Sequence, residues 1–389
     1  MFPGKVSCGI WISLAQVANR ALSADTCCQL NDREPTMLGS FRFFLALCVV
    51  LFHLTGQIAN LGQFAVECFY VISGYLVTMI LNRTYKFEFK SFALNRFLRL
   101  YPSYYALALL TLFMWFALPR MSEFHACWVW AGRTTDVIGN VLIWPWTFFP
   151  DQPGNYKFRL IPSTWSIAVE ICCYFLLWAF AARSWRWTVV TLLASAAYHA
   201  YSLSTGMEPA TRYSPVSAAM LAFCTGSLAY RASEFVVKHR PVWMTRTAAQ
   251  PLLLLIAIGA FGAVWKASTY DGTATTNPYY YAVILVAATV SLMFHGIRTS
   301  GPLGHVDRWL GDLSYPVFLI HYPAGYLVWL AIGQPDAMRS WTIALWAMPV
   351  AVAISIAVVQ LVDVPLRRIR DEVRSRAPGV LVPAQSTAP

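Results

Sequence analysis

Long apolar stretches separated by short polar segments run along most of this 389-residue chain. Each has close to the roughly 20 mostly apolar residues that a helix needs to cross the hydrocarbon core of a bilayer. We count about ten such stretches: Phe41–Asn60, Phe64–Leu81, Tyr101–Pro119, Thr164–Ala182, Trp187–Ser204, Ser214–Ala232, Pro251–Trp265, Tyr279–Ile297, Leu313–Ile332 and Trp341–Val362. A further segment, Val137–Phe149, is predicted to be a half-span or an interfacial helix. The pattern predicts an all-α, polytopic integral membrane protein with about ten transmembrane helices.

Composition supports this class, and the placement of basic residues predicts an orientation. Hydrophobic residues make up 58% of the chain and charged residues 12%, about half the charged share of a typical soluble domain. Short cytoplasmic loops accumulate Lys and Arg. With the N-terminus inside, 21 of the 29 Lys and Arg residues fall on the cytoplasmic side, 7 outside, and Arg42 at the cytoplasmic mouth of the first stretch. Both termini are therefore predicted to be cytoplasmic, and the +11 net charge requires no nucleic acid as a partner.

The two ends of the chain differ from the apolar part between them. Residues 1–36 are too polar for a span and make a poor signal peptide, so we predict a poorly ordered extension with Met37 as the working start. Residues 37–368 form the predicted membrane domain, and 369–389 a flexible cytoplasmic tail. Because little sequence follows the last stretch, no fused extracytoplasmic domain is expected. The nine cysteines show no disulfide framework or metal-binding spacing, and we predict no metal site.

Two ionisable residues share the first apolar stretch, where such groups are costly and commonly functional. Arg42 and His53 are 11 residues apart, close to three helical turns, so both project from one face about 16 Å apart. Two interpretations are open. Either Arg42 reaches the lipid headgroups and His53 is a satisfied core residue, or the pair forms a line from the cytoplasmic mouth to a reactive imidazole.

Four more segments place polar residues on shared helix faces inside or beside the apolar stretches. The segments are "FAVECFYVISGYL" (64–76) with Glu67 and a Ser73–Gly74 pair, "LNRFLRLYPSYY" (94–105) with Arg96 and Arg99, "STWSIAVEICCYF" (163–175) with Trp165, Ser166 and Glu170, and "DLSYPVFLIHYP" (312–323) with Ser314 and His321. The Ser-Gly pair favours close approach of another helix. Taken singly, the arginines can serve topology alone, and a tryptophan at a span end often lies at the membrane interface.

Together and in this order, these segments resemble the integral-membrane acyltransferase-3 family, whose members O-acylate sugars and some antibiotics. The resemblance covers about Leu38 to Arg368. The matching pieces are the Arg-x10-His of "RFFLALCVVLFH", then "VECFYVISGYL", "RFLRLYP", "TWSIAVE", "LSYPVFLIH" and the closing "DVPLRR". The chain departs from the family pattern in reading "LGSFR" where Asp-Gly often precedes the first Arg, Ala65 where Gly is common, and Asp363 where Glu is common.

The resemblance implies transfer of an acyl group, usually acetyl, from cytoplasmic acyl-CoA to an acceptor hydroxyl. Arg42, Arg96 and Arg99 are then the candidates for the donor phosphates, because guanidinium groups match phosphate oxygens. His53 is the catalytic candidate, either as a general base or as the acyl carrier itself. The weaker candidates for the acceptor are Glu67, Trp165, Ser166, Glu170 and His321, with Glu170 expected near the outer mouth. No bound cofactor is expected, since acyl-CoA is a donor substrate.

The sequence thus predicts a multi-pass O-acetyltransferase of the bacterial inner membrane that acetylates a cell-surface or exported polysaccharide or a lipid-linked glycan. The alternative is a transporter or flippase for a lipid-linked sugar, which would be expected to show broken helices in two matching halves; we find no such symmetry. The outer segment Met121–Pro162 is unusually long for a connection. Its aromatic residues either stack on sugar rings or lie at the membrane interface.

Overall fold

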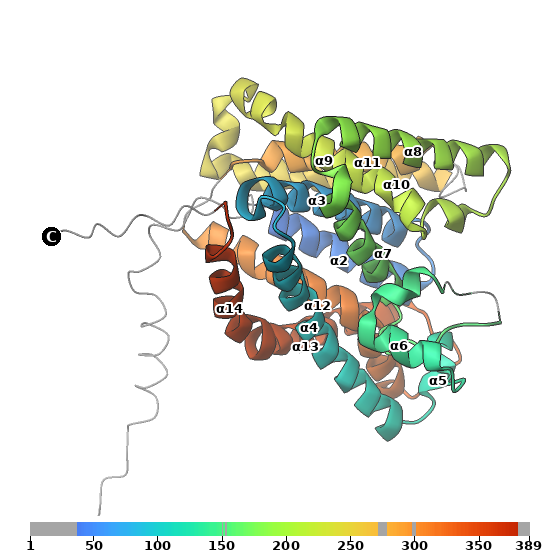
Figure 1. Cartoon of the computed structure of the whole chain (residues 1–389). Helices are drawn as coiled ribbons and strands as arrows, with labels where there is room; N and C mark the ends of the chain where they lie inside the picture. Colours follow the sequence, from blue (N-terminus) through green and yellow to red (C-terminus); the bar gives the residue numbers. More distant parts are fainter. Residues whose placement is uncertain (1–36, 150, 152–153, 271–277, 298–300, 380–389) are drawn as a thin grey trace, which may run out of the picture. The chain divides into compact units, whose positions relative to one another are not determined.

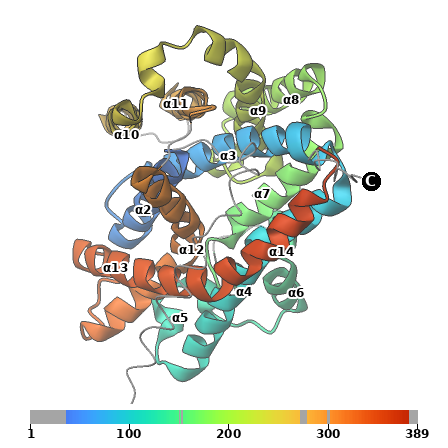
Figure 2. The ribbon, with the colours of Figure 1, turned by 90° about the vertical axis from the view of Figure 1, so that its left-hand side faces the viewer.

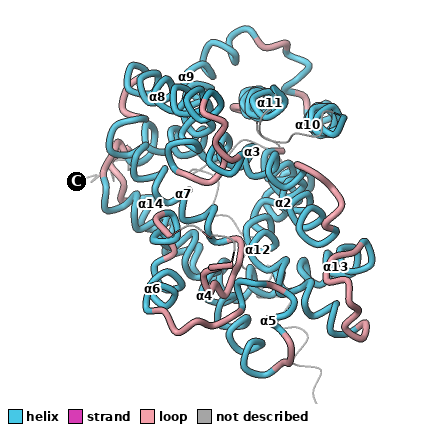
Figure 3. Tube along the Cα trace, turned by 90° about the vertical axis from the view of Figure 1, so that its right-hand side faces the viewer, coloured by secondary structure: helices cyan, strands magenta, loops and turns pink. Residues whose placement is uncertain are grey.

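The computed structural model describes residues 37–149, 151, 154–270, 278–297 and 301–379 (Figure 1). Within these ranges the chain is built from helices and connecting loops, without a β-strand (Figure 3). The predicted extension at residues 1–36 lies outside the described residues, as do residues 380–389.

Each predicted apolar stretch falls on a helix. These helices are α2 (Leu38–Thr55), α3 (Leu61–Ile80), α4 (Phe89–Ala117), α7 (Thr164–Leu176), α8 (Trp185–Ser204), α9 (Val216–His239), α10 (Gln250–Tyr270), α11 (Pro278–Phe294), α12 (Pro302–Ala331) and α13 (Trp341–Val358). Among the described residues, six helical segments are long and apolar enough to cross a membrane, those of α2, α3, α4, α7, α10 and α13, and α11 is apolar but shorter. The predicted all-α, multi-pass membrane protein is confirmed, whereas the count of ten spans and the orientation of the termini stay predictions.

Helices α2, α3 and α12 lie in the middle of the bundle (Figure 2). Helices α9 and α11 pack on α3, with α8 on α9 and α10 on α11 beyond them. Helices α4 and α13 pack on α12. The α3–α9 contact depends on Gly74, where an added Cβ would lie 2.1 Å from the Phe223 carbonyl oxygen. The predicted close approach of a helix at the Ser73–Gly74 pair is therefore present, because only a residue without a side chain fits there.

Chain direction gives the bundle two ends, which we name for the side chains they carry. The histidine end is where α2 stops at Thr55 and α7 begins at Thr164. The arginine end is where α2 begins at Leu38 and α4 begins at Phe89. Arg96 and Arg99 therefore lie near one end of the bundle, and His53 lies near the other.

Three helices end in a π-helical turn at the arginine end: α3 in η2 (Leu81–Tyr85), α7 in η5 (Leu177–Ala181) and α13 in η9 (Val359–Asp363). After η9 the chain continues as α14 (Val364–Ser375), which packs along α4 (Figure 2). Residues 369–375, which we expected in a flexible tail, are thus helical. The reason is a set of tertiary contacts, with Ser103 Oγ donating to Asp363 Oδ1 at 2.6 Å and Asn95 Nδ2 donating to the Arg370 carbonyl at 3.3 Å.

The long connection between α4 and α7 is folded rather than extended. It contains α5 (Met121–Phe124), η3 (Ala126–Trp128), α6 (Thr134–Leu142) and η4 (Trp144–Thr147). Helix α6 has nine residues, too few to cross a bilayer, so the segment predicted as a half-span or interfacial helix is a short helix and a 3-10 turn. Three further 3-10 turns, η6 (Pro209–Arg212), η7 (Val242–Thr245) and η8 (Thr247–Ala249), join helices elsewhere.

Candidate active site

His53 stands in the last turn of α2 and meets α12 at the histidine end. Helix α2 is unbroken from Leu38 to Thr55, so Arg42 and His53 share one helix as predicted. The Tyr322 hydroxyl lies 2.7 Å from His53 Nδ1. The His321 ring is stacked on the His53 ring with centroids 5.2 Å apart. His53 is half-buried, and its imidazole is held against α12.

Two loop residues complete what we call the histidine cluster: His53, His125, His321, Tyr322 and Arg339. The His125 ring lies 4.4 Å from the Tyr322 ring, and the Arg339 guanidinium carbon lies 5.3 Å from the Tyr322 centroid. Ser340 N donates to the Leu54 carbonyl at 2.9 Å, which fixes the Arg339 loop on the end of α2. No group of His, Cys, Asp or Glu in the described ranges has the arrangement of a metal site.

Electrostatics keep one member of the cluster neutral. Burial, with the positive charges of Arg339 and Arg159, lowers the pKa of His125 to about 3. Its Nδ1 accepts a hydrogen bond from the Cys127 backbone N–H at 3.1 Å, as an unprotonated nitrogen does. His125 therefore remains an uncharged imidazole throughout the physiological pH range.

His321 is fully buried, and the acceptor role predicted for it stays a prediction. Its Nδ1 lies 2.6 Å from the Phe318 carbonyl, and its Nε2 has no hydrogen-bond partner among the described residues. Because a carbonyl only accepts, Nδ1 carries the proton in a neutral ring and Nε2 has the lone pair. The structure brings His321 to His53 and Tyr322 within one cluster.

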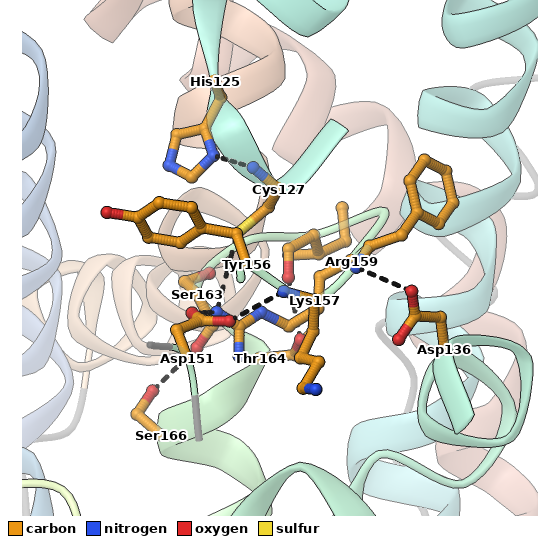
Figure 4. A network of polar contacts seen from close by, with 12 residues as sticks. His125, Cys127, Asp136, Asp151, Tyr156, Lys157, Arg159, Ser163, Thr164 and Ser166 are labelled. Carbon is orange, nitrogen blue, oxygen red and sulfur yellow. Dashed lines mark hydrogen bonds and ion pairs between the residues drawn. The ribbon is translucent and has the colours of Figure 1, made fainter. Parts of the chain in front are cut away.

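A buried ion pair organises the connection that carries His125 (Figure 4). Arg159 is 2% exposed and pairs with the Asp151 carboxylate. Its backbone N–H donates to the Cys127 carbonyl at 3.0 Å, and its Nη2 lies 3.5 Å from the Cys127 sulfur. The backbone N–H of Phe158 donates to Asp136 Oδ2 at 3.1 Å. These bonds fix η3 and thereby place His125 against Tyr322.

Glu170 of α7 is held by α3 and by its own helix, and its expected place near the outer mouth stays a prediction. Ser73 Oγ donates to Glu170 Oε1 at 2.5 Å, and the Tyr174 hydroxyl donates to the same oxygen at 2.5 Å. The Arg96 guanidinium carbon lies 5.9 Å from the Tyr174 ring centroid. These contacts form a polar chain that runs from Glu170 through Tyr174 to Arg96, toward the arginine end. Sequence reasoning assigned Ser73 to helix packing, but the packing role belongs to Gly74, and Ser73 holds Glu170.

Tyr70 of α3 lies in electrostatic range of both Glu67 and Glu170. Its hydroxyl donates to the Ser166 carbonyl at 3.4 Å. Glu67 is fully buried, and neither carboxylate oxygen has a hydrogen-bond partner among the described residues. Tyr280 of α11 lies beside Glu67, yet its hydroxyl donates to the Arg212 carbonyl at 2.8 Å. Trp165 packs edge-on against Tyr213, with centroids 5.1 Å apart. Ser166 Oγ donates back to the Ser163 carbonyl at 2.9 Å (Figure 4).

The donor candidates lie at the arginine end. Arg99 pairs with Asp312 of α12 at 3.6 Å, and Arg96 Nη2 donates to Asn95 Oδ1 at 3.3 Å. Arg42 is half-buried on α2. Sequence reasoning missed Arg370, which α14 brings into electrostatic range of Arg96 and Arg99.

Three other neighbours of the site were also missed, namely Tyr322, His125 and Arg339. Tyr322 follows His321 directly in "LIHYP", so a pair of polar aromatic residues at that position was the available signal. Nothing local in the sequence distinguishes His125 or Arg339 from other loop residues.

Comparison with known proteins identifies the family of the chain. A family model described as an acyltransferase domain matches residues 38–360, and the chain belongs to that acyltransferase-3 family, as the motifs predicted. Over 335 residues it is 24% identical to the peptidoglycan O-acetyltransferase OatA of Listeria monocytogenes, covering 78% of this chain and 51% of that protein. Over 316 residues it is 25% identical to YrhL of Bacillus subtilis, whose name provisionally gives the same activity, covering 74% of this chain and 48% of YrhL.

The chain thus spans about half the length of the curated relatives it matches. No solved structure matches it.

Proposed function

We propose that this chain is a membrane O-acetyltransferase that moves acetyl from acyl-CoA, bound at the arginine end, to a hydroxyl of a cell-envelope glycan. The names of its two relatives favour peptidoglycan as the acceptor, and an exported polysaccharide is the other acceptor of the same class. The observation that carries the proposal is the hydrogen-bonded His53–Tyr322 pair in a chain of the acyltransferase-3 family. In this proposal the membrane is the bacterial inner membrane, and the arginine end is cytoplasmic.

His53 is the group that handles the proton in this reaction. The acceptor hydroxyl oxygen attacks the thioester carbon, a C–O bond forms, and the C–S bond to CoA breaks. The hydroxyl proton passes to an imidazole nitrogen of His53 and from there to the departing CoA sulfur, so the charges balance. General-base assistance of this kind contributes roughly 10²- to 10⁴-fold.

Tyr322 decides which nitrogen of His53 is the base. A neutral imidazole has one N–H and one lone pair. When Nδ1–H donates to the Tyr322 oxygen, the lone pair is on Nε2, and the same hydrogen bond stabilises the imidazolium that forms during attack. Tyr322 is thus a positioning residue for His53 in this mechanism.

The other candidates have supporting roles in the proposal. Arg96 and Arg99 bind the phosphates of the donor, and Arg42 contributes from α2. Arg42 and His53, 11 residues apart on one helix, are separated by about 16 Å along its axis, a distance comparable to an extended pantetheine arm. Glu170, held by Ser73 and Tyr174, lies between the two ends and accepts hydrogen bonds from the arm.

The test uses membranes that contain wild type, His53→Ala or His305→Ala at matched expression, given acetyl-CoA radiolabelled in the acetyl group. His305 is an exposed histidine of α12 and serves as the matched control. We expect wild type and His305→Ala to label glycan equally and His53→Ala to lose roughly 100-fold or more. Full labelling by His53→Ala would remove His53 from the mechanism. If wild type transfers no label, the acyltransferase proposal fails and the flippase alternative gains.

A further inference from the structure

We infer that Arg370 of α14 completes, with Arg96 and Arg99 of α4, a binding site for the phosphate-bearing nucleotide head of the acyl donor. This inference rests on the proposed function. It gives helix α14 a role in recognising the acyl donor, in addition to any effect of its positive charge on membrane orientation.

The position of Arg370 follows from two hydrogen bonds that hold α14 on α4. Ser103 Oγ donates to Asp363 Oδ1 at 2.6 Å where α14 begins. Asn95, the neighbour of Arg96, donates to the Arg370 carbonyl at 3.3 Å. The same surface of α4 therefore carries Arg96 and holds the backbone of Arg370.

Asp312 and Asp363 both lie in electrostatic range of Arg370, as do Arg96 and Arg99, so with Arg370 itself the arginines outnumber the carboxylates. Arg99 and Arg367 both pair with Asp312, at 3.6 and 2.8 Å. Neither Arg96 nor Arg370 has a carboxylate within ion-pair distance among the described residues, and the Nε–H of each is buried without a hydrogen-bond acceptor there. Like charges held together with unused donors are stabilised by an anion, and guanidinium groups match phosphate oxygens.

The direction of the polar chain supports the same ligand. Arg96 lies over the Tyr174 ring, and Tyr174 and Ser73 both donate to Glu170. A molecule with phosphates at one end and a polar arm at the other can contact the arginines and Glu170 together. Inorganic phosphate has no group that extends toward Glu170.

The experiment measures equilibrium binding of three probes to the purified full-length protein. The probes are acetyl-CoA, its 3′-dephospho analogue and S-acetylpantetheine, which has no nucleotide. The variants are Arg370→Gln, Arg370→Lys and Arg368→Gln. Arg368 is exposed on the same helix, so Arg368→Gln makes the same change in net charge. Thermal unfolding verifies that each variant is folded.

We expect Arg370→Gln to weaken acetyl-CoA binding about tenfold or more, with S-acetylpantetheine unchanged and Arg368→Gln close to wild type. Arg370→Lys keeps the charge and restores part of the affinity. If Arg370→Gln binds the dephospho analogue as tightly as wild type does, Arg370 contacts the 3′-phosphate. If Arg370→Gln loses the same affinity for acetyl-CoA and for the dephospho analogue, Arg370 contacts the diphosphate.

Two results would overturn the inference while leaving the proposed function in place. One is wild-type affinity of Arg370→Gln for acetyl-CoA, and the other is an equal loss in Arg370→Gln and Arg368→Gln. Failure of wild type itself to bind acetyl-CoA would reject the proposed donor and this site together.

Discussion

At the scale of single residues, the contact between Tyr322 and His53 joins two helices that are far apart in sequence. The hydroxyl and Nδ1 are 2.7 Å apart, and Tyr322 is itself packed against His125 and beneath Arg339. Its position is thus fixed from both sides, which is what a group that orients a base requires.

Replacing Tyr322 by Phe keeps the ring and removes the hydroxyl oxygen that, in the proposed mechanism, accepts from His53 Nδ1–H. A hydrogen bond to a charged group contributes about 1.5–3 kcal/mol, so we expect kcat for acetyl transfer to fall roughly 10- to 100-fold, with KM for acetyl-CoA and thermal stability little changed. Steady-state kinetics of Tyr322→Phe against Tyr201→Phe, an exposed control on α8, tests this. A change in KM alone would contradict the role of Tyr322.

The low pKa of His125 predicts acid sensitivity of the fold. The folded-state pKa is about 3, against about 6.5 for an unfolded histidine. Between these values the unfolded chain binds more protons, so the free energy of unfolding decreases as the pH falls below about 6.5. We expect His125→Gln to lose less thermal stability than wild type between pH 7.5 and pH 5. Equal losses in the two proteins would show that His125 does not contribute.

Some of these residue-scale features were predictable and others were not. The shared face of Arg42 and His53 was predictable because a helix repeat is local. The stacking of His321 on His53 was not, because it depends on how α12 crosses α2. The hydrogen bond from Ser73 to Glu170 was not predictable either, because it depends on how α7 packs on α3.

At the scale of elements, apolar runs located the helices and misjudged several of their ends. Helix α4 begins at Phe89 and α12 at Pro302, well before the apolar stretches at Tyr101 and Leu313. The added turns are polar, and a polar turn continues a helix when tertiary contacts hold it. The same reason explains α14, whose charged residues gave no membrane signal and whose helix is stabilised against α4.

Crossing of α3 and α9 gives a prediction at this scale. Gly74→Ala would place a Cβ 2.1 Å from the Phe223 carbonyl, and overpacking of this kind costs about 1–3 kcal/mol or more. Gly259→Ala on α10 meets no atom within 4 Å and gains the helix propensity of alanine. We expect a lower melting temperature for Gly74→Ala and an unchanged or higher one for Gly259→Ala. A wild-type melting temperature for Gly74→Ala would mean that the two helices do not cross so closely.

At the scale of the whole molecule, the candidate groups lie at two ends of one bundle. The arginines lie at the end where α2 begins, and the histidine cluster lies where it ends. For the proposed reaction, the donor therefore enters at one membrane surface and the acceptor at the other.

This orientation is testable with single cysteines in a cysteine-free background. Positive charge favours the cytoplasmic side, so we expect Arg368→Cys to react with a membrane-impermeant maleimide only after cells are permeabilised. Asp336→Cys, in the exposed loop between α12 and α13, is expected to react in intact cells. The opposite labelling pattern would show that the protein has the opposite orientation in the membrane, with the donor site outside.

In the π-helical turn η9, apart from Asp363, the number of residues between α13 and α14 matters more than their identity. Each residue advances a helix by about 100°, since 3.6 residues make a turn. Deleting one residue from Val359–Asp363 would restore regular α-helical geometry while rotating α14 by that angle and carrying Arg370 off the surface of α4. During evolution residues 359–362 are thus free to vary in composition, whereas Asp363 is held by its hydrogen bond to Ser103 and the junction is constrained in length. Related chains should therefore show substitutions at residues 359–362 without insertions or deletions.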